Sequence, residues 1–337
     1  MAGQTTAKNQ SSNLTAHLER VAIVGQAAGQ LGRHITQEIL KSGRHSITAL
    51  TRQGGSSKFP EGVKVAFVDY DDEESIVSAL KGHEFLIITL AYSAGPETHN
   101  KIVQAAAKAK IPHIMPNIYT ADVVLNNKAI GDETGMGPAF RPLLSEIERL
   151  GLTWTVLVTG LWYEFSLACP PDWFGFDINK REVTLFDDGQ ARINTTTWAQ
   201  CGRAVASFLG LKKSPDGDND STPTLQQFKN KPIYVSSFMI NQREMLDSVE
   251  RVTGTSDADW NIQYESTAKR IKDGKAAFAA GDSKGLAKAY YSRVFSPDSP
   301  AIYQQKLHNS VFGLPDEDLD DATLIGVNMA KNGYSPF

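Results

Sequence analysis

Side chains that could move protons are present in this chain of 337 residues, but their spacing excludes several common catalytic arrangements. In a Tyr-x-x-x-Lys pair on one helix face, the lysine lowers the pKa of the tyrosine for proton transfer to a carbonyl oxygen. None of the ten tyrosines has a lysine four positions later; Tyr119 and Tyr163 are followed there by Val123 and Leu167. The seven histidines show no metal-ligand spacing, and a serine-hydrolase elbow, a Walker loop and a His-Glu-x-x-His helix are missing. We therefore expect no catalytic metal and none of these motifs.

A glycine-rich stretch, VAIVGQAAGQLGRH at residues 21–34, has the composition of a phosphate-binding loop. Gly25, Gly29 and Gly32 lie between an apolar run and a segment with helical spacing. Glycines leave the backbone free of side chains, so a phosphate can closely approach a helix N-terminus. There, unpaired N–H groups and the helix dipole point at it. The alternative is a tight strand-to-helix turn. The strand, the loop and the helix together favour a bound dinucleotide.

The end of the second expected strand indicates which dinucleotide would bind. That strand ends in Leu-Thr-Arg-Gln at residues 50–53, without the acidic residue that bonds the ribose of NAD. Arg52 offers a planar set of donors that matches the extra phosphate of NADP, and Lys58 could assist it. The alternative for Arg52 is a solvated loop residue. We expect NADP, with Asp69 and Tyr70 flanking the adenine unless Asp69 caps the following helix.

These residues need a framework, and strands alternate with helices through the first half of the chain. We expect strands at 21–25, 45–51, 63–68, 84–90, 113–116 and 153–158, and helices at 31–43, 71–82, 99–109 and 140–150. This rhythm predicts an α/β fold, a doubly wound parallel sheet of the Rossmann type with helices on both faces.

Beyond residue 160 the regular alternation stops. We expect strands at 183–186, 232–240 and 260–264, helices at 197–211, 242–252, 267–280 and 284–292, and a solvated loop at 214–224. The expected organisation is a disordered N-terminus over residues 1–18 and an NADP-binding Rossmann domain over 19–160. Residues 161–337 would form mainly a smaller α+β substrate-binding lobe over the carboxyl ends of the strands, with some segments returning to the Rossmann domain.

Composition and charge narrow the range of partners. The net charge is -4 and no block of Lys or Arg stands out, so neither nucleic acid nor an anionic membrane is an expected partner. The N-terminus lacks the apolar core of a secretion signal, and no apolar run reaches ~18 residues. We expect a cytoplasmic protein, monomer or homodimer, that binds a small molecule. Cys169 and Cys201 are then buried thiols rather than a disulfide.

Several stretches resemble the NmrA-like or isoflavone-reductase-like group of atypical short-chain dehydrogenases. They are VAIVGQAAGQLGRHI, ALTRQGG, VKVAFVDYDDEESIVSALKGHEFLIITL, IPHIMPN and TWTVLVTGLWYEFSL. The run from GLWYEFSL to INTTTWAQCGRAV is similar to fungal CipA-like oxidoreductases, and the likeness covers most of residues 20–245. It implies an NADP-binding Rossmann domain, a small substrate lobe and NADPH-dependent reduction of aromatic or polyketide-like secondary metabolites.

The resemblance also implies roles along the expected carboxyl edge of the sheet. The residues it assigns to the cofactor, besides the three glycines, are Gln30 and Leu31 for the pyrophosphate, Arg52 and Lys58 for the 2′-phosphate, Thr89 and Ala91 for the nicotinamide ribose, and Pro116 and Asn117 for the nicotinamide.

Two departures from the family pattern bear on the chemistry. The glycine loop has one extra residue between Gly25 and Gly29, which would change the fit to the pyrophosphate. The lysine that plant members use as general acid/base is not found, because the matching window, residues 137–142, reads GPAFRP. Arg141 in that window is a poor acid, since its pKa exceeds 12.

Other residues must then be considered as proton donors. Tyr119, Tyr163 and Asn117 have suitable groups, although either tyrosine could instead pack against the cofactor or the substrate. Lys128 lies upstream in what reads as a polar loop and is a further candidate, with a merely solvated side chain as the alternative.

An aromatic cluster follows the sixth expected strand at the end where the site should lie. The expected substrate-binding residues are Trp162, Tyr163, Phe165, Trp173 and Phe176. Core packing explains part of such a cluster, and a flat, apolar substrate would explain the rest.

Three functions follow from these observations. The leading one is NADPH-dependent reduction of a carbonyl or a carbon–carbon double bond in a small aromatic or conjugated metabolite. The missing lysine favours an NADP(H)-sensing regulatory protein instead, whereas the aromatic cluster argues against a sensor. A redox-neutral isomerase or cyclase that reuses the fold is the third.

Overall fold

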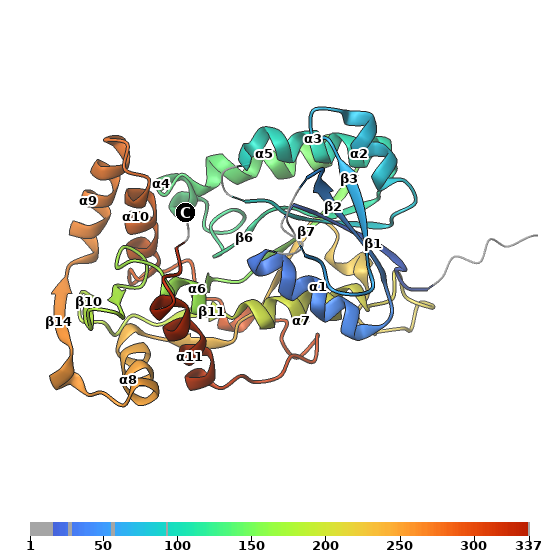
Figure 1. The fold of residues 1–337 in the computed structure, drawn as a ribbon. Coiled ribbons are helices and arrows are strands. Elements are labelled where there is room, and N and C mark those ends of the chain that lie inside the picture. Colours follow the sequence, from blue (N-terminus) through green and yellow to red (C-terminus); the bar gives the residue numbers. More distant parts are fainter. Residues whose placement is uncertain (1–15, 26–28, 55–57, 92–93, 336–337) are drawn as a thin grey trace, which may run out of the picture.

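The computed structural model describes residues 16–25, 29–54, 58–91 and 94–335. The expectation of disorder for residues 1–18 therefore falls largely outside the described part of the chain. Figure 1 shows a layered group of elements around one large sheet, and beside it a second group that contains α8, α9, α10 and β14.

The large sheet confirms the expected doubly wound topology. Its order is β12-β7-β5-β4-β1-β2-β3, with β6 paired to β7, and all its pairs are parallel. The strands are β1 (Arg20–Gly25), β2 (Ser46–Arg52), β3 (Val63–Val68), β4 (Phe85–Thr89), β5 (His113–Met115), β6 (Tyr119–Thr120), β7 (Thr153–Val158) and β12 (Lys231–Tyr234). Because β1 pairs with β2 on one side and with β4 on the other, the strand order reverses there. Ligands of such sheets bind at the carboxyl ends of the strands at this point.

Helices cover both faces of the large sheet. The helices α2 (Glu73–Leu80), α3 (Gly95–Lys108) and α5 (Met136–Arg149) lie on one face, and α1 (Gln30–Ser42) and α7 (Trp198–Leu209) lie on the other. Alternate residues of β1 enter different cores: Ala22 and Val24 belong to the first, Val21 and Ile23 to the second. This two-sided burial is why the strand reads as a continuous apolar run.

Helix α1 carries one apolar face and has a defined end. Leu31, Ile35 and Ile39 are buried, and Gly43 ends the helix in a left-handed conformation, with φ of 63°. Its neighbour α7 approaches closely because Gly202 has no side chain; a Cβ there would lie 2.6 Å from the carbonyl oxygen of His34. The two helices therefore pack almost backbone to backbone.

The second group of elements contains two small sheets and several helices. One sheet has the order β13-β11-β8 and the other β14-β10-β9. The strands are β8 (Leu161–Trp162), β9 (Phe176–Asp177), β10 (Glu182–Phe186), β11 (Ile193–Thr196), β13 (Phe238–Ile240) and β14 (Asn261–Glu265); the helices are α6 (Tyr163–Ala168), α8 (Gln242–Thr253), α9 (Thr267–Ala279), α10 (Lys284–Val294) and α11 (Leu319–Lys331), with 3-10 turns η3 (Asp257–Asp259) and η4 (Gln304–Lys306). Two further short elements pack on the layers of the large sheet, α4 (Lys128–Glu133) against α5 and the 3-10 turn η2 (Leu225–Phe228) against β12.

A buried arginine ties this second group together. Arg270 on α9 is only 3% exposed. Its guanidinium donates to the Ser292 hydroxyl at 3.0 Å, pairs with Glu265 at 3.0 Å and lies 4.0 Å above the centre of the Phe186 ring. One side chain thus links α9 to α10, β14 and β10.

The structure corrects several expected elements. Residues 232–240 are two strands rather than one, because β12 joins β7 in the large sheet whereas β13 pairs antiparallel with β11. Ser236 lies between them, and its hydroxyl bonds the carbonyl oxygens of Thr195 and Phe238, which turns the chain. Lys128 is the first residue of α4 and not part of a loop, since residues 128–133 complete helical hydrogen bonds.

Two helices also begin earlier than expected. Helix α3 starts at Gly95 because Pro96 is tolerated in the first turn, where no helical N–H bond is lost. Helix α5 starts at Met136 and includes Pro142. Both α7 and β12 follow residue 160 yet belong to the layers of the large sheet, so the domain boundary at residue 160 stays a prediction.

Candidate functional site

The carboxyl end of β1 is built for a residue without a side chain. Gly25 has φ of +102°, a conformation that favours glycine, and a Cβ there would lie 2.7 Å from the carbonyl oxygen of Thr89. The Thr89 hydroxyl in turn donates to the carbonyl oxygen of Val24 at 3.3 Å. The ends of β1 and β4 therefore meet closely, directly before the chain enters α1.

Among the described residues, no side chain caps the N-terminus of α1. Gly29 is its N-cap, and the first turn contains no acidic residue. Gln30 is half-buried and Leu31 buried, while Gly32 accepts a hydrogen bond from the Thr36 hydroxyl at 2.7 Å. Residues 26–28 of the loop lie outside the described part of the chain. Free N–H groups and the positive end of the helix dipole make this end suitable for a phosphate.

Helix α7, which packs beside α1, shows the contrast. Its N-cap Thr197 accepts a hydrogen bond from the N–H of Gln200 at 2.9 Å, and the Glu164 carboxyl accepts one from the N–H of Trp198 at 2.8 Å. The chain thus supplies its own acceptors at the N-terminus of α7. At the N-terminus of α1, the described residues supply no such side-chain acceptor.

Arg52 lies at the end of β2, as expected, and its side chain is exposed. Its charge acts on the half-buried Tyr70, whose pKa is raised by burial and lowered to a smaller extent by Arg52. Lys58 is exposed as well. Asp69 accepts a hydrogen bond from the N–H of Asp71 at 2.9 Å, and the cap of α2 is a different residue, Asp72. Of the residues expected near the adenosine part of NADP, Arg52 and Tyr70 are thus the two whose side chains influence each other electrostatically.

The residues expected beside the nicotinamide hold β5 and β6 against β4. The Asn117 amide donates to the carbonyl oxygen of Leu90 at 3.2 Å, and the Tyr119 hydroxyl donates to that of Ile88 at 3.0 Å. Pro116 is buried and Ala91 is half-buried. Burial raises the pKa of Tyr119. Both expected proton donors thus donate a hydrogen bond to backbone carbonyl groups at the end of β4.

Tyr163 and Lys128, the other expected donors, lie in different surroundings. Tyr163 is fully buried, its hydroxyl is hydrogen-bonded to that of Thr323 on α11 at 2.6 Å, and burial raises its pKa. Lys128 is exposed at the start of α4. The Tyr163 hydroxyl therefore faces α11 rather than the edge of the large sheet.

The expected aromatic cluster divides into two groups. Trp173 and Phe176 pack within the second group of elements, with ring centres 6.2 Å from Tyr291 and 6.4 Å from Trp260, respectively. The other group, which we call the α1 aromatic group, lies beside the start of α1 and consists of Trp162, Phe165, Trp198 and Tyr334.

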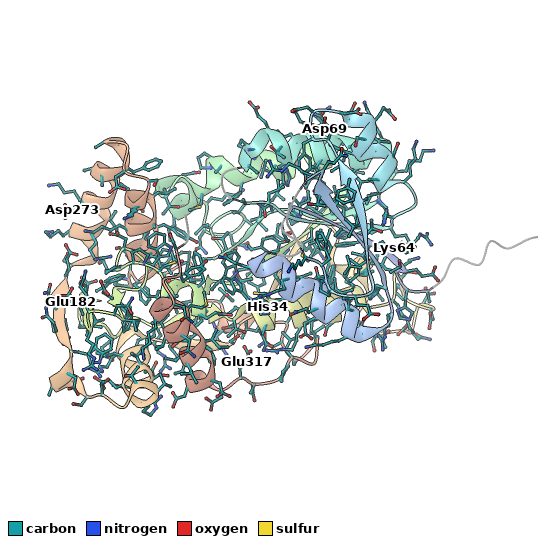
Figure 2. The ribbon with its side chains drawn as sticks, in the orientation of Figure 1. His34, Lys64, Asp69, Glu182, Asp273 and Glu317 are labelled. Atoms are coloured by element: carbon teal, nitrogen blue, oxygen red, sulfur yellow. The ribbon has the colours of Figure 1, made fainter. Side chains whose placement is uncertain are left out.

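The α1 aromatic group is the part of the cluster that can line a site. The Phe165 ring centre lies 5.7 Å from that of Trp162, 5.9 Å from that of Trp198 and 6.0 Å from that of Tyr334. Trp162, Phe165 and Tyr334 keep part of their surface exposed. His34 on α1 stacks on Trp198 at 6.0 Å, and burial, with Arg33, lowers its pKa to about 4, so the imidazole is neutral. Figure 2 shows His34 on this helix.

Glu164 is a residue of this region that the sequence analysis did not single out. It stands inside the apolar run LWYEFSLA and is 3% exposed. One carboxyl oxygen bonds Trp198, and the other has no hydrogen-bond partner among the described residues. Burial raises the pKa of Glu164 to about 7, and the charge of Glu317 acts in the same direction. A single acidic residue within an apolar run was the signal that could have found it.

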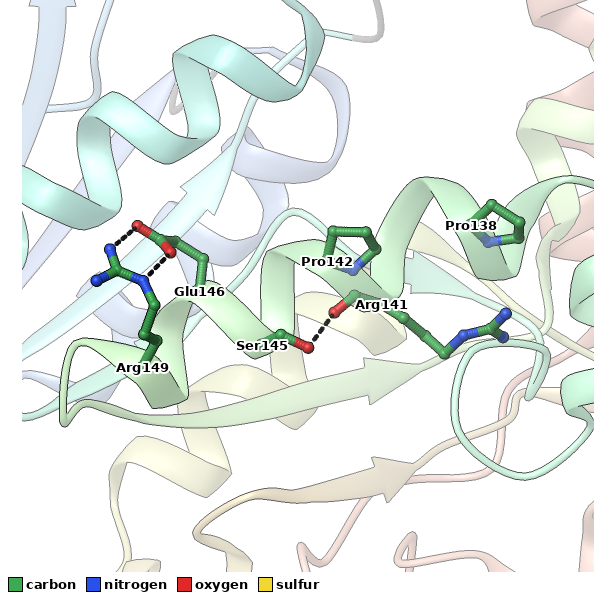
Figure 3. Close-up of a pocket in the computed structure, with 6 residues that line it drawn as sticks. All are labelled: Pro138, Arg141, Pro142, Ser145, Glu146 and Arg149. Atoms are coloured by element: carbon green, nitrogen blue, oxygen red, sulfur yellow. Dashed lines mark hydrogen bonds and ion pairs between the residues drawn. The ribbon is translucent and has the colours of Figure 1, made fainter.

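Two hollows lie away from these residues. One, of about 470 Å³, follows the outer side of α5 (Figure 3), and one of about 560 Å³ lies between α1, α7 and residues 311–315. Neither is lined by any residue that the sequence predicts for the site. Neither hollow therefore coincides with the candidate site, which we place at the carboxyl edge of the large sheet, where the expected residues lie.

The described part of the chain also bears on metal binding and on membrane insertion. Within the described ranges, no three His, Cys, Asp or Glu side chains come together in a way that could hold a metal ion. The same ranges contain no helix with the length and apolarity needed to cross a bilayer. Cys169 and Cys201 are free and buried, as expected.

The chain is similar to several known proteins. Residues 18–135 match the model of the NmrA-like family. The oxidoreductase aprR of Aspergillus flavus is 26% identical over 253 residues, which are 73% of this chain and 76% of the relative. Quinone oxidoreductase 2 of Escherichia coli is 29% identical over 279 residues, 80% of this chain and 88% of the relative. The expected family resemblance and the expected oxidoreductase class are both confirmed.

Solved structures share the fold. The structure described as AtPrR2 with NADP+ and (+)pinoresinol has a TM-score of 0.68 and 18% identity, and covers 93% of this chain and 100% of its own. The Escherichia coli quinone oxidoreductase in complex with NADPH has a TM-score of 0.63 and 19% identity, with 90% and 98% covered. At identities of 18% and 19%, the similarity to these structures establishes the fold alone.

Proposed function

We propose that this chain, whose residues 18–135 match the NmrA-like family model, binds NADPH along the carboxyl edge of its large sheet and reduces a small aromatic or conjugated compound. The observation that carries the proposal is the uncapped N-terminus of α1 next to the close contact of Gly25 with Thr89. Arg52 at the tip of the neighbouring strand adds the charge that distinguishes NADPH from NADH. The relatives, which are named as oxidoreductases, support the same assignment.

The chain offers a group for each part of the dinucleotide. The N–H groups of Gln30, Leu31 and Gly32 would bind the pyrophosphate, and Arg52 with Lys58 would bind the 2′-phosphate. The nicotinamide ring would lie beside the segments 89–91 and 116–117, which Asn117 and Tyr119 hold together. When bound, the reduced nicotinamide supplies a hydride.

The substrate class follows from what surrounds the site. Trp162 and Phe165 offer flat apolar surface, and the neutral His34 adds no charge. Tyr119 and Asn117 donate to backbone carbonyl groups, so the site suits an acceptor that needs little acid catalysis. Hydride addition to a quinone or an enone gives a delocalised oxyanion that water can protonate. We therefore infer a conjugated carbonyl compound as the substrate.

The test compares the two dinucleotides by calorimetry. Arg52→Glu should weaken NADPH binding at least about tenfold, because it removes a charge-assisted contact and adds repulsion, and should leave NADH binding nearly unchanged. Lys64→Glu, at an exposed position of the edge strand β3, is the matched control (Figure 2). Wild-type protein should also oxidise NADPH with a panel of quinones and enones. Absence of binding to either dinucleotide would refute the proposal.

A second function is favoured by one observation. The expected donors Tyr119 and Asn117 are engaged with backbone carbonyl groups, and Tyr163 is bonded to Thr323 within the core. An NADP(H)-sensing protein needs no proton donor at all. Tight NADPH binding without turnover on the whole panel, together with a protein partner captured only in one redox state of the dinucleotide, would select this function instead.

A further inference from the structure

The turn that follows α11 places a half-buried tyrosine beside α1. Helix α11 ends at Lys331, and Gly333, with φ of 73°, turns the chain so that the N–H of Tyr334 donates to the carbonyl oxygen of Met329 at 3.0 Å. The residues on either side of Tyr334 are exposed, whereas Tyr334 itself is half-buried, and Figure 1 shows α11 between α8 and α7. Tyr334 is therefore held in place by a helix-ending turn.

Tyr334 contacts the residue that begins α1. The side-chain amide of Gln30 donates a hydrogen bond to the Tyr334 hydroxyl. The Tyr334 ring meets the Phe165 ring edge to face, at 6.0 Å between centres and 78° between planes. Burial raises the pKa of Tyr334, so the phenol stays neutral and adds no negative charge beside the helix end. The contact thus joins residues that are 304 positions apart in the sequence.

We infer that Tyr334 is a positioning residue of the dinucleotide site, which holds the first residue of α1 in place for the pyrophosphate. This inference rests on the proposed function. The N-cap Gly29 offers no side chain that could fix the opening of α1, so the Gln30–Tyr334 contact supplies that restraint from the other end of the chain. A binding site that is already ordered loses less entropy when the ligand binds, and its affinity is higher for that reason.

The experiment measures the Kd of NADPH by calorimetry for a graded set of variants. Tyr334→Phe keeps the ring on Phe165 and removes the hydroxyl, so we expect roughly a three- to tenfold weaker affinity, the worth of one net hydrogen bond. Tyr334→Ala, and a chain that ends at Gly333, should bind more weakly still. Tyr264→Phe makes the same chemical change at a tyrosine that is 65% exposed on β14, and should bind like the wild type.

Two further measurements separate positioning from general damage to the fold. The KM for NADPH should rise in Tyr334→Phe, while kcat at saturating NADPH stays within about twofold. The reason is that Tyr334 contacts Gln30 at the start of α1, which would bind the pyrophosphate, and not the reacting ring. In a Gln30→Ala background, Tyr334→Phe should cause no further loss, since its partner is gone. If Tyr334→Ala or the shortened chain does not fold, Tyr334→Phe decides the question alone.

The outcomes distinguish the two proposals. If wild-type protein binds NADPH and Tyr334→Phe binds equally well or more tightly, the inference is overturned and the proposed function stands. A fall in kcat with unchanged Kd overturns it too. If wild-type protein binds no dinucleotide, the proposed function fails, and the inference fails with it.

Discussion

Replacing Glu164 by glutamine tests whether this buried carboxyl keeps its proton in the folded protein below neutral pH. The side chain is 3% exposed, and burial raises its pKa from the ordinary value of 4.5 to about 7. Glutamine retains an oxygen that can accept the hydrogen bond from the N–H of Trp198, and it has no charge at any pH. The variant therefore removes the titration and keeps the contact.

The size of the effect follows from the difference between the two pKa values. Between about pH 4.5 and about pH 7 the folded protein holds a proton on Glu164 that the unfolded chain releases, so the stability from this group is complete at low pH and is lost as the pH rises. Each pH unit is worth at most about 1.4 kcal/mol, and the total over this window is about 3 kcal/mol. Relative to wild type, Glu164→Gln should thus gain almost nothing near pH 4.5 and about 3 kcal/mol above about pH 8.

Urea denaturation over a series of pH values measures this difference directly. All other titrating groups are common to both proteins and cancel in the comparison. Glu182→Gln, at an exposed position at the start of β10 (Figure 2), makes the same substitution without changing a buried group and serves as the matched control. A difference between Glu164→Gln and wild type that does not change with pH would refute the reasoning, because it would mean that Glu164 titrates alike in the folded and unfolded chain.

Two other substitutions test the packing of the fold. Gly25→Ala should lower the free energy of unfolding by about 1–3 kcal/mol in urea denaturation and weaken NADPH binding, because its Cβ would lie 2.7 Å from the Thr89 carbonyl oxygen at a φ of +102°; unchanged stability would contradict the close contact. Arg270→Met should cost about 2 kcal/mol in the same assay, since it removes the ion pair with Glu265, which keeps Lys269, and the hydrogen bond to the Ser292 hydroxyl. A loss below about 1 kcal/mol would show that Arg270 does not link the second group of elements.

The first half of the chain could be predicted well because its inner strands, such as β1 and β4, are buried on both faces and read as apolar runs. Residues 63–68 and 153–158 were expected as strands with the bounds that β3 and β7 have. Prediction failed where two adjacent strands belong to different sheets, as at 232–240, because an apolar run does not show which strand it pairs with. Helix α11 was missed as well.

The structure places Gly25 and Arg52, the residues expected to bind phosphates, at the strand ends that the sequence predicts, whereas other contacts near the candidate site could not be predicted from the sequence. Gly25 and Arg52 are recognisable because a turn and a charge at a strand end have local sequence patterns. The hydrogen bonds of Asn117 and Tyr119 go to backbone carbonyl groups of another strand, and no residue type marks those acceptors. The contact between Gln30 and Tyr334 depends on tertiary folding alone. Their roles in the site stay predictions until a ligand is bound.

The return of α7 and β12 to the large sheet has a consequence for how the polypeptide is made. A nascent chain released up to residue 160 would lack β12, one of the strands that pair with β7, and α7, which packs against α1. The core that contains Ile35 and Ile39 would then miss the apolar side chains of α7 and β12. We expect that a gene fragment stopping at residue 160 yields aggregated product, and that ribosomes must synthesise β12 before the large sheet can acquire protease resistance.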